Sequence, residues 1–70
     1  MNAQEFTDLH RRLKISRAEL CRRIGIAPNS GTAYAAGRKP IPLTVALACA
    51  AVAFNLPPYG AQSDEPNDLD

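Results

Sequence analysis

Seventy residues suffice for one small domain, near the size at which a single core is only marginally stable without a staple or a partner. The net charge of +1 conceals an asymmetry: residues 1–60 hold all eight Lys and Arg against three carboxylates, a charge of +5, and the last ten residues hold four carboxylates. A basic body favours an anionic partner. Cys21 and Cys49 lack metal-ligand spacing, so we expect buried thiols and no metal, cofactor or disulfide.

No membrane or export segment is predicted. Residues 1–14 are amphipathic and lack the apolar core of a signal peptide. The longest apolar run, residues 43–56, is 14 residues long, whereas a membrane-spanning helix needs roughly 20. We therefore expect a cytoplasmic, soluble protein with no membrane partner.

Two helices are predicted in the first 25 residues. Apolar residues three to four positions apart mark one face of a first helix, and Asn2 followed by Glu5 is a capping-box pattern. Ser16 followed by Glu19 repeats that pattern at the start of a second helix, with Glu19 expected to reach back to Ser16. Gly25 is expected to end this helix in the left-handed conformation.

Two further helices and a tail are predicted in the remainder. A third helix is expected from Pro28 to Ala36, closed by Gly37, since proline is tolerated in a first turn. A fourth, apolar nearly all round, is expected over residues 42–56 with Pro42 as its first residue, buried in the core or against a second copy. Residues 61–70 are too polar to fold alone, and we predict a disordered acidic tail after a domain of residues 1–60.

Residues 17–36 resemble the twenty-residue helix-turn-helix of the Cro/C1-type (XRE-like) DNA-binding proteins, which include small phage and mobile-element repressors. That pattern requires apolar, small, apolar and glycine residues at positions 4, 5, 8 and 9, then apolar residues at positions 10, 15 and 18. Six of the seven agree, and the positions are held by Leu20, Cys21, Ile24, Gly25, Ile26, Gly31 and Tyr34. The resemblance implies an all-α, four- to five-helix, lambda-repressor-like domain.

Two departures from this pattern are visible. Gly31 stands where relatives have a buried branched residue, and we expect it to allow close approach of a neighbouring helix or of DNA. Relatives also pair an arginine of the first helix with a glutamate after the recognition helix; His10 and Ala35 replace them here, so this bridge is absent.

The resemblance also implies the DNA-contacting residues. The base-reading set is Asn29, Ser30, Thr32 and Ala33, and the phosphate-contacting set is Ser16, Arg17, Tyr34, Arg38 and Lys39. Asn29 and Ser30 also suit a simple role as helix caps, and Tyr34 suits the core. Of Arg11, Arg12, Arg22 and Arg23, we expect at most two to touch DNA.

The predicted function is a transcriptional repressor, not an enzyme, that binds an inverted-repeat operator in double-stranded DNA as a homodimer. Its expected interface residues are Leu47, Ala50, Ala51, Phe54 and Leu56, with the segment up to Tyr59. No small-molecule effector is indicated. The alternatives are an antitoxin-like regulator whose acidic tail engages another protein, and a protein-interaction module of the same fold without specific DNA reading.

Overall fold

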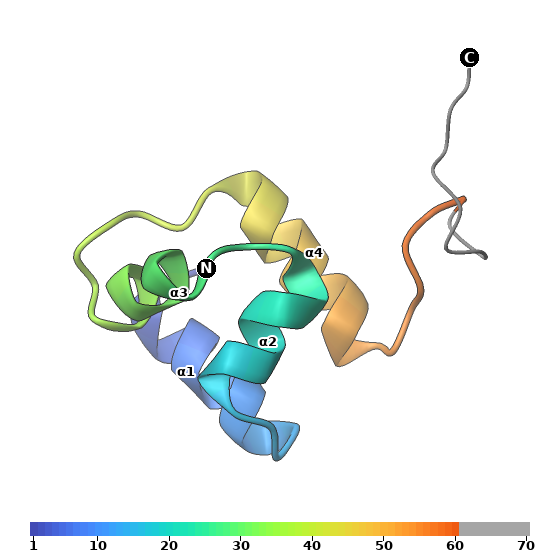
Figure 1. Cartoon of the computed structure of the whole chain (residues 1–70), viewed down its shortest axis with the longest axis horizontal. Coiled ribbons are helices and arrows are strands. Elements are labelled where there is room, and N and C mark those ends of the chain that lie inside the picture. Colours follow the sequence, from blue (N-terminus) through green and yellow to red (C-terminus); the bar gives the residue numbers. More distant parts are fainter. Residues whose placement is uncertain (61–70) are drawn as a thin grey trace.

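The structure, a computed structural model, describes residues 1–60, which form four α-helices and no strand (Figure 1). The helices are α1 (Ala3–Arg12), α2 (Arg17–Ile24), α3 (Pro28–Ala35) and α4 (Leu43–Ala53). The expectation of an all-α fold is confirmed, whereas the predicted tail at 61–70 lies outside the described residues. None of these four helices has the length and apolar character needed to cross a bilayer.

The helices begin with two kinds of N-terminus. At α1 the predicted capping box is present: Glu5 N donates to Asn2 Oδ1, and Asn2 N donates to Glu5 Oε1, both at 2.8 Å. At α2 the Ser16 hydroxyl accepts from Glu19 N at 3.0 Å, as predicted. By contrast, Ala27 and Pro42, the N-caps of α3 and α4, provide no side-chain hydrogen bond, so tertiary packing has to hold these two helices.

All four helices end in the same backbone motif. In each, a residue with positive φ follows the last turn, and the next N–H returns to a carbonyl five residues earlier. Gly25 and Gly37 hold the left-handed position after α2 and α3, as predicted. Lys14, with φ of 61°, and Asn55, with φ of 58°, hold it after α1 and α4. The sequence gives no glycine at these last two ends, and neither was predicted.

The fourth helix is shorter than predicted. It ends at Ala53 rather than near Leu56, and Pro42 is its N-cap rather than its first helical residue. The apolar run continues to Leu56, but Leu56 N already donates to Ala51 O, which turns the chain out of the helix. The residues that follow α4 lead away from the helices, on the side of the molecule opposite α3 (Figure 1).

The core lies where the four helices meet. Phe6 and Leu20 are fully buried, and the rings of Phe6 and Tyr34 pack edge to face with centroids 5.9 Å apart. Cys21 and Cys49 are each 1 % exposed, and burial raises the pKa of both thiols. Both cysteines are therefore packing residues, as expected from the sequence.

Candidate nucleic-acid interface

At Gly31, α3 packs closely against α2. Gly31 is buried, and a Cβ placed on it would overlap Cys21 Sγ, with Arg17 Cγ only 3.9 Å away. The close approach expected at Gly31 is therefore to the neighbouring helix. The cysteine sulfur fills the space that the missing side chain leaves, and the first turn of α2 comes to lie beside the middle of α3.

The outer face of α3 is polar and small. Asn29, Thr32 and Ala36, spaced as i, i+3 and i+7, are all exposed, and Ser30 is half-buried. Thr32 Oγ1 donates to Pro28 O at 3.2 Å, so its donor is used within the helix. Neither Asn29 nor Ser30 caps α3, because the N-cap is Ala27. Ala36 was not singled out from the sequence, although the i+7 spacing from Asn29 points to it.

Two residues of α3 that were predicted to touch DNA are buried. Ala33 is 9 % exposed, and its carbonyl accepts from Arg38 N at 2.9 Å, so the chain that follows α3 returns beside it. Its methyl group is not displayed beside Asn29 and Thr32, and it is not part of the candidate interface. Tyr34 is 7 % exposed and its ring belongs to the core, which was the first of its two expected roles.

Exposed cations lie at both sides of α3. Arg17, at the first position of α2, is exposed and contributes its stem to the contact at Gly31. Arg38 and Lys39 follow Gly37 and are exposed as well. The hydroxyl oxygen of Ser16 accepts the cap hydrogen bond, which leaves its O–H available as a donor. We define the candidate DNA face as Ser16, Arg17, Asn29, Thr32, Ala36, Arg38 and Lys39.

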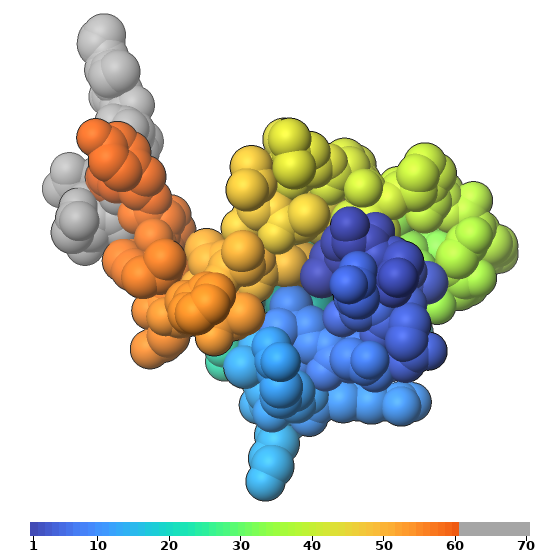
Figure 2. Space-filling view, turned by 180° about the vertical axis from the view of Figure 1, so that it is seen from behind, coloured from blue at the N-terminus to red at the C-terminus, as the bar shows by residue number. Residues whose placement is uncertain are grey.

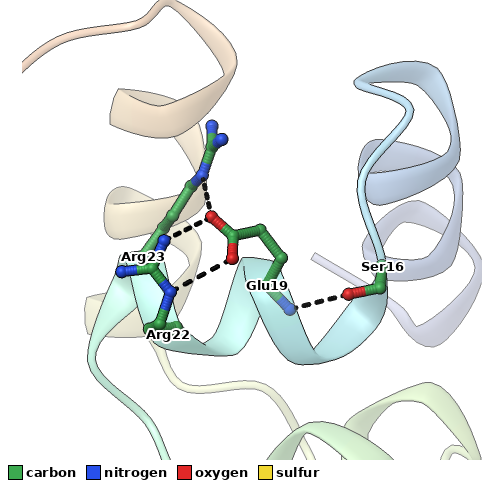
Figure 3. A network of polar contacts seen from close by, with 4 residues as sticks. All are labelled: Ser16, Glu19, Arg22 and Arg23. Atoms are coloured by element: carbon green, nitrogen blue, oxygen red, sulfur yellow. Dashed lines mark hydrogen bonds and ion pairs between the residues drawn. The ribbon is translucent and has the colours of Figure 1, made fainter.

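Glu19 pairs with two arginines instead of reaching back to Ser16. Arg22 donates to its two carboxylate oxygens at 3.1 and 2.6 Å, and Arg23 Nε donates to Oε2 at 2.9 Å (Figure 3). These hydrogen bonds, with that of Arg22 the larger influence, lower the pKa of Glu19 to about 2. The capping box predicted at Ser16 is therefore only half formed. The i, i+3 and i, i+4 spacing of these residues is the signal that could have predicted the cluster.

His10 lies at the boundary of the core. It is half-buried, and its ring Nδ1 lies 3.2 Å from Ile15 O, a distance at which an Nδ1–H donates to the carbonyl. The ring thus joins the last turn of α1 to the residue that follows it. Both ion pairs within residues 1–60 involve Glu19, and neither includes His10 or the neighbourhood of Ala35.

The outer side of α4 carries an apolar stripe. Leu43, Leu47, Ala50 and Phe54, spaced over three turns, are exposed, and the stripe continues into Leu56 and Tyr59. Leu47 is 61 % and Phe54 77 % exposed, whereas Ala51 is half-buried. We call these six exposed residues the α4 stripe.

A groove runs beside the stripe between α1 and α4. It has a volume of about 740 Å³, with small α4 residues on one wall and Glu5, Asp8 and Arg12 of α1 on the other. Figure 2 shows this side of the molecule, with α1 and α4 next to each other and the segment after α4 projecting away.

Comparisons of the chain with protein-family models, curated proteins and solved structures found no match. Within residues 1–60, no three His, Cys, Asp or Glu residues gather into a group that could hold a metal ion.

Proposed function

We propose that this protein is a sequence-specific DNA-binding transcriptional regulator of the Cro/C1 (XRE-like) helix-turn-helix type. In this proposal α3 is a recognition helix that enters the major groove. The observation that carries it is the composition of the candidate DNA face. The exposed Asn29 amide and the methyl groups of Thr32 and Ala36 lie on and directly after α3, and exposed cations lie on α2 and after Gly37. The role that fits best is repression of its own operon by occlusion of a promoter.

The outer face of α3 suits A·T-rich reading. The Asn29 amide can donate to and accept from adenine N7 and N6, a bidentate pair. Because the Thr32 hydroxyl donates to Pro28 O, its methyl group is the part best placed to meet a thymine methyl. No arginine lies between Pro28 and Ala36, so bidentate guanine reading from α3 is absent, and part of the selectivity would come from DNA shape.

The cations beside α3 would hold the flanking phosphates. Arg17 and Ser16 lie at the N-terminus of α2, where free backbone N–H groups and a hydroxyl also favour an anion. Arg38 and Lys39 follow the C-terminal end of α3 and are exposed. Contacts of this kind fix the register of the helix on the duplex without reading its sequence.

We further propose that the α4 stripe is covered by a second copy of the chain. Leu43, Leu47, Phe54, Leu56 and Tyr59 each expose at least 60 % of their surface. Phe54 and Tyr59 are aromatic, with about 150–250 Å² for a whole side chain, and together with the three leucines they present on the order of several hundred Å². A standard interface needs about 800 Å² from each partner. A two-fold dimer would place two recognition helices about 34 Å apart, over inverted half-sites one turn apart.

The test is fluorescence anisotropy of the protein with its own upstream DNA and with a scrambled duplex, across a salt series. We expect the upstream DNA to bind about a thousandfold more tightly. Equal, steeply salt-dependent binding to both would contradict sequence-specific regulation. Absence of binding to either would favour a protein-interaction module with the same fold.

Two variants test the division of roles on the candidate DNA face. Asn29→Ala removes a base reader, so we expect discrimination to fall by about 1–3 kcal/mol with an unchanged salt slope. Arg38→Ala removes a phosphate contact, so we expect weaker binding to both duplexes and a salt slope shallower by about 1. Equal effects of the two substitutions on both readouts would contradict this assignment.

A further inference from the structure

Glu19 holds two of the eight cations of the chain in one ion-pair cluster (Figure 3). Arg22 engages both carboxylate oxygens, and Arg23 adds a third hydrogen bond to one of them. The carboxylate is the least exposed member, with 28 % of its side chain accessible against 73 % for Arg22 and 45 % for Arg23. Arg17, Arg38 and Lys39, which border α3, have no ion pair within the described residues.

The cluster lies close enough to the candidate DNA face to influence it. Arg22 and Arg23 follow Arg17 by five and six residues, a rise of roughly 8–9 Å along a helix. This is about one Debye length at physiological salt. Unpaired cations at these two positions would therefore strengthen the attraction of any phosphate near Arg17, and this attraction is independent of base sequence.

We propose that Glu19 limits the sequence-independent attraction of the protein to DNA by pairing with Arg22 and Arg23. The inference rests on the proposed function and adds a residue outside the candidate DNA face. Asn29 and Thr32 read bases in the major groove, and Glu19 lowers the electrostatic attraction that all DNA sequences share.

Two features make the cluster persistent. A carboxylate that accepts three hydrogen bonds from two guanidinium groups is a small network rather than an isolated surface pair. The pKa of Glu19, lowered to about 2 by these arginines, keeps the carboxylate charged throughout the physiological range. Glu19 also occupies the first turn of α2, where a negative charge is favoured by the helix dipole.

The experiment is a double-mutant cycle on the whole chain. Binding to the scrambled duplex is measured by anisotropy from low to moderate salt for wild type, Glu19→Gln, Arg22→Gln/Arg23→Gln and the triple variant. We expect Glu19→Gln to bind more tightly at low salt by about tenfold, with a slope steeper by about one to two, since two cations become free for phosphates. In the Arg22→Gln/Arg23→Gln background, the same substitution should give a much smaller gain.

The two backgrounds are matched because Glu19→Gln changes the net charge by the same amount in both. An equal gain in both backgrounds would show a general charge effect and would overturn the inference, as would no gain in either. Failure of the proposed function is a separate result, namely wild type that does not distinguish its upstream DNA from the scrambled duplex. Circular dichroism melting of each variant confirms that it is folded at the assay temperature.

Discussion

The helix pair α2–α3 and the helix pair α1–α4 are built in different ways. Between α2 and α3, the Cys21 sulfur fills the space beside Gly31, and a glycine holds the left-handed position after each helix. Between α1 and α4 a groove of about 740 Å³ remains, Lys14 and Asn55 hold the left-handed position after the two helices, and α4 exposes an apolar stripe. The first pair is specified by individual residues, whereas the second leaves apolar surface that folding does not cover.

The largest effect on stability is expected from Gly31→Ala, which breaks the close packing of α2 on α3. The new Cβ overlaps Cys21 Sγ, and overpacking of this kind costs about 1–3 kcal/mol, more than the roughly 1 kcal/mol that alanine gains in helix propensity. We expect urea denaturation, followed by circular dichroism, to show destabilisation of about 1–2 kcal/mol. That is a large part of the total for so small a domain.

The control for this prediction is the same substitution in a chain that carries Cys21→Ala. With the sulfur removed, the Cβ has room, and the sign reverses: Gly31→Ala should now stabilise by about 0.5–1 kcal/mol. Destabilisation of equal size in both backgrounds would mean that Cys21 does not fill the space left at Gly31.

Most helix starts and stops follow from local patterns in the sequence. The start of α1 and the bounds of α2 and α3 were predicted to within a residue or two, because Asn2, Ser16, Gly25 and Gly37 act locally as starts and stops, whereas the end of α1 was not predicted. The end of α4 was placed near Leu56, because the apolar run offers no stop residue before Pro57. A helix start or end that carries a capping or stop residue is therefore predictable from local sequence, whereas the ends of α1 and α4, which carry no glycine, are not.

The candidate DNA face was predictable only in part. The exposure of Asn29 and Thr32 follows from helical spacing, but Ala33 shares their side and is buried, since the chain after α3 returns beside it. The Glu19 side chain was expected to accept from the backbone N–H of Ser16. It pairs with arginines instead, because a guanidinium group is a stronger partner for a carboxylate than a backbone N–H. These features depend on tertiary contacts and on competition between partners, which a linear pattern does not contain.

The second prediction concerns the α4 stripe, which belongs to the α1–α4 pair. Leu47→Glu places a charge in the middle of the α4 stripe, and burying it in an interface would be costly. We expect sedimentation equilibrium to show a mass of one chain instead of two, and affinity for an inverted-repeat duplex to fall by about a hundredfold as bivalent binding is lost.

Thr44→Glu is the matched control, since it adds the same charge to an exposed polar position of α4 that lies roughly 60–120° around the helix from the α4 residues of the stripe. This variant should remain a dimer. A wild-type chain that is monomeric at micromolar concentration, or a Leu47→Glu variant that stays dimeric, would contradict the assignment of the stripe to a second copy.

The third prediction exchanges the helix ends of the two pairs. Lys14 has φ of 61°, a conformation that costs an L-residue roughly 1–2 kcal/mol and glycine nothing. Lys14→Gly should therefore stabilise by about 0.5–1 kcal/mol, after the larger unfolded-state entropy of glycine is offset. Gly25→Ala is the reverse test, because a Cβ there meets nothing within 4 Å and only its φ of 80° matters. It should destabilise by about 1 kcal/mol. A Lys14→Gly chain that melts at a lower temperature than wild type, or a Gly25→Ala chain that melts at a higher one, would contradict the backbone argument.

The smallest effect concerns the charge of α2. Arg22 and Arg23 hold the pKa of Glu19 at about 2, against 4.5 for an unperturbed glutamate. A carboxyl group whose pKa is lower in the folded state stabilises above its unfolded pKa, and this contribution disappears as the pH falls from about 4.5 to about 2. The stability difference between wild type and Glu19→Gln should therefore be constant from pH 7 to about 5 and decline below it.

Carbon-13 NMR of the Glu19 carboxyl group should give a midpoint near 2, which rises toward 4.5 in the Arg22→Gln/Arg23→Gln variant. A midpoint that is the same in both chains would show that α2 owes nothing to this cluster, and would leave the contact at Gly31 as the one residue-specific feature of the α2–α3 pair.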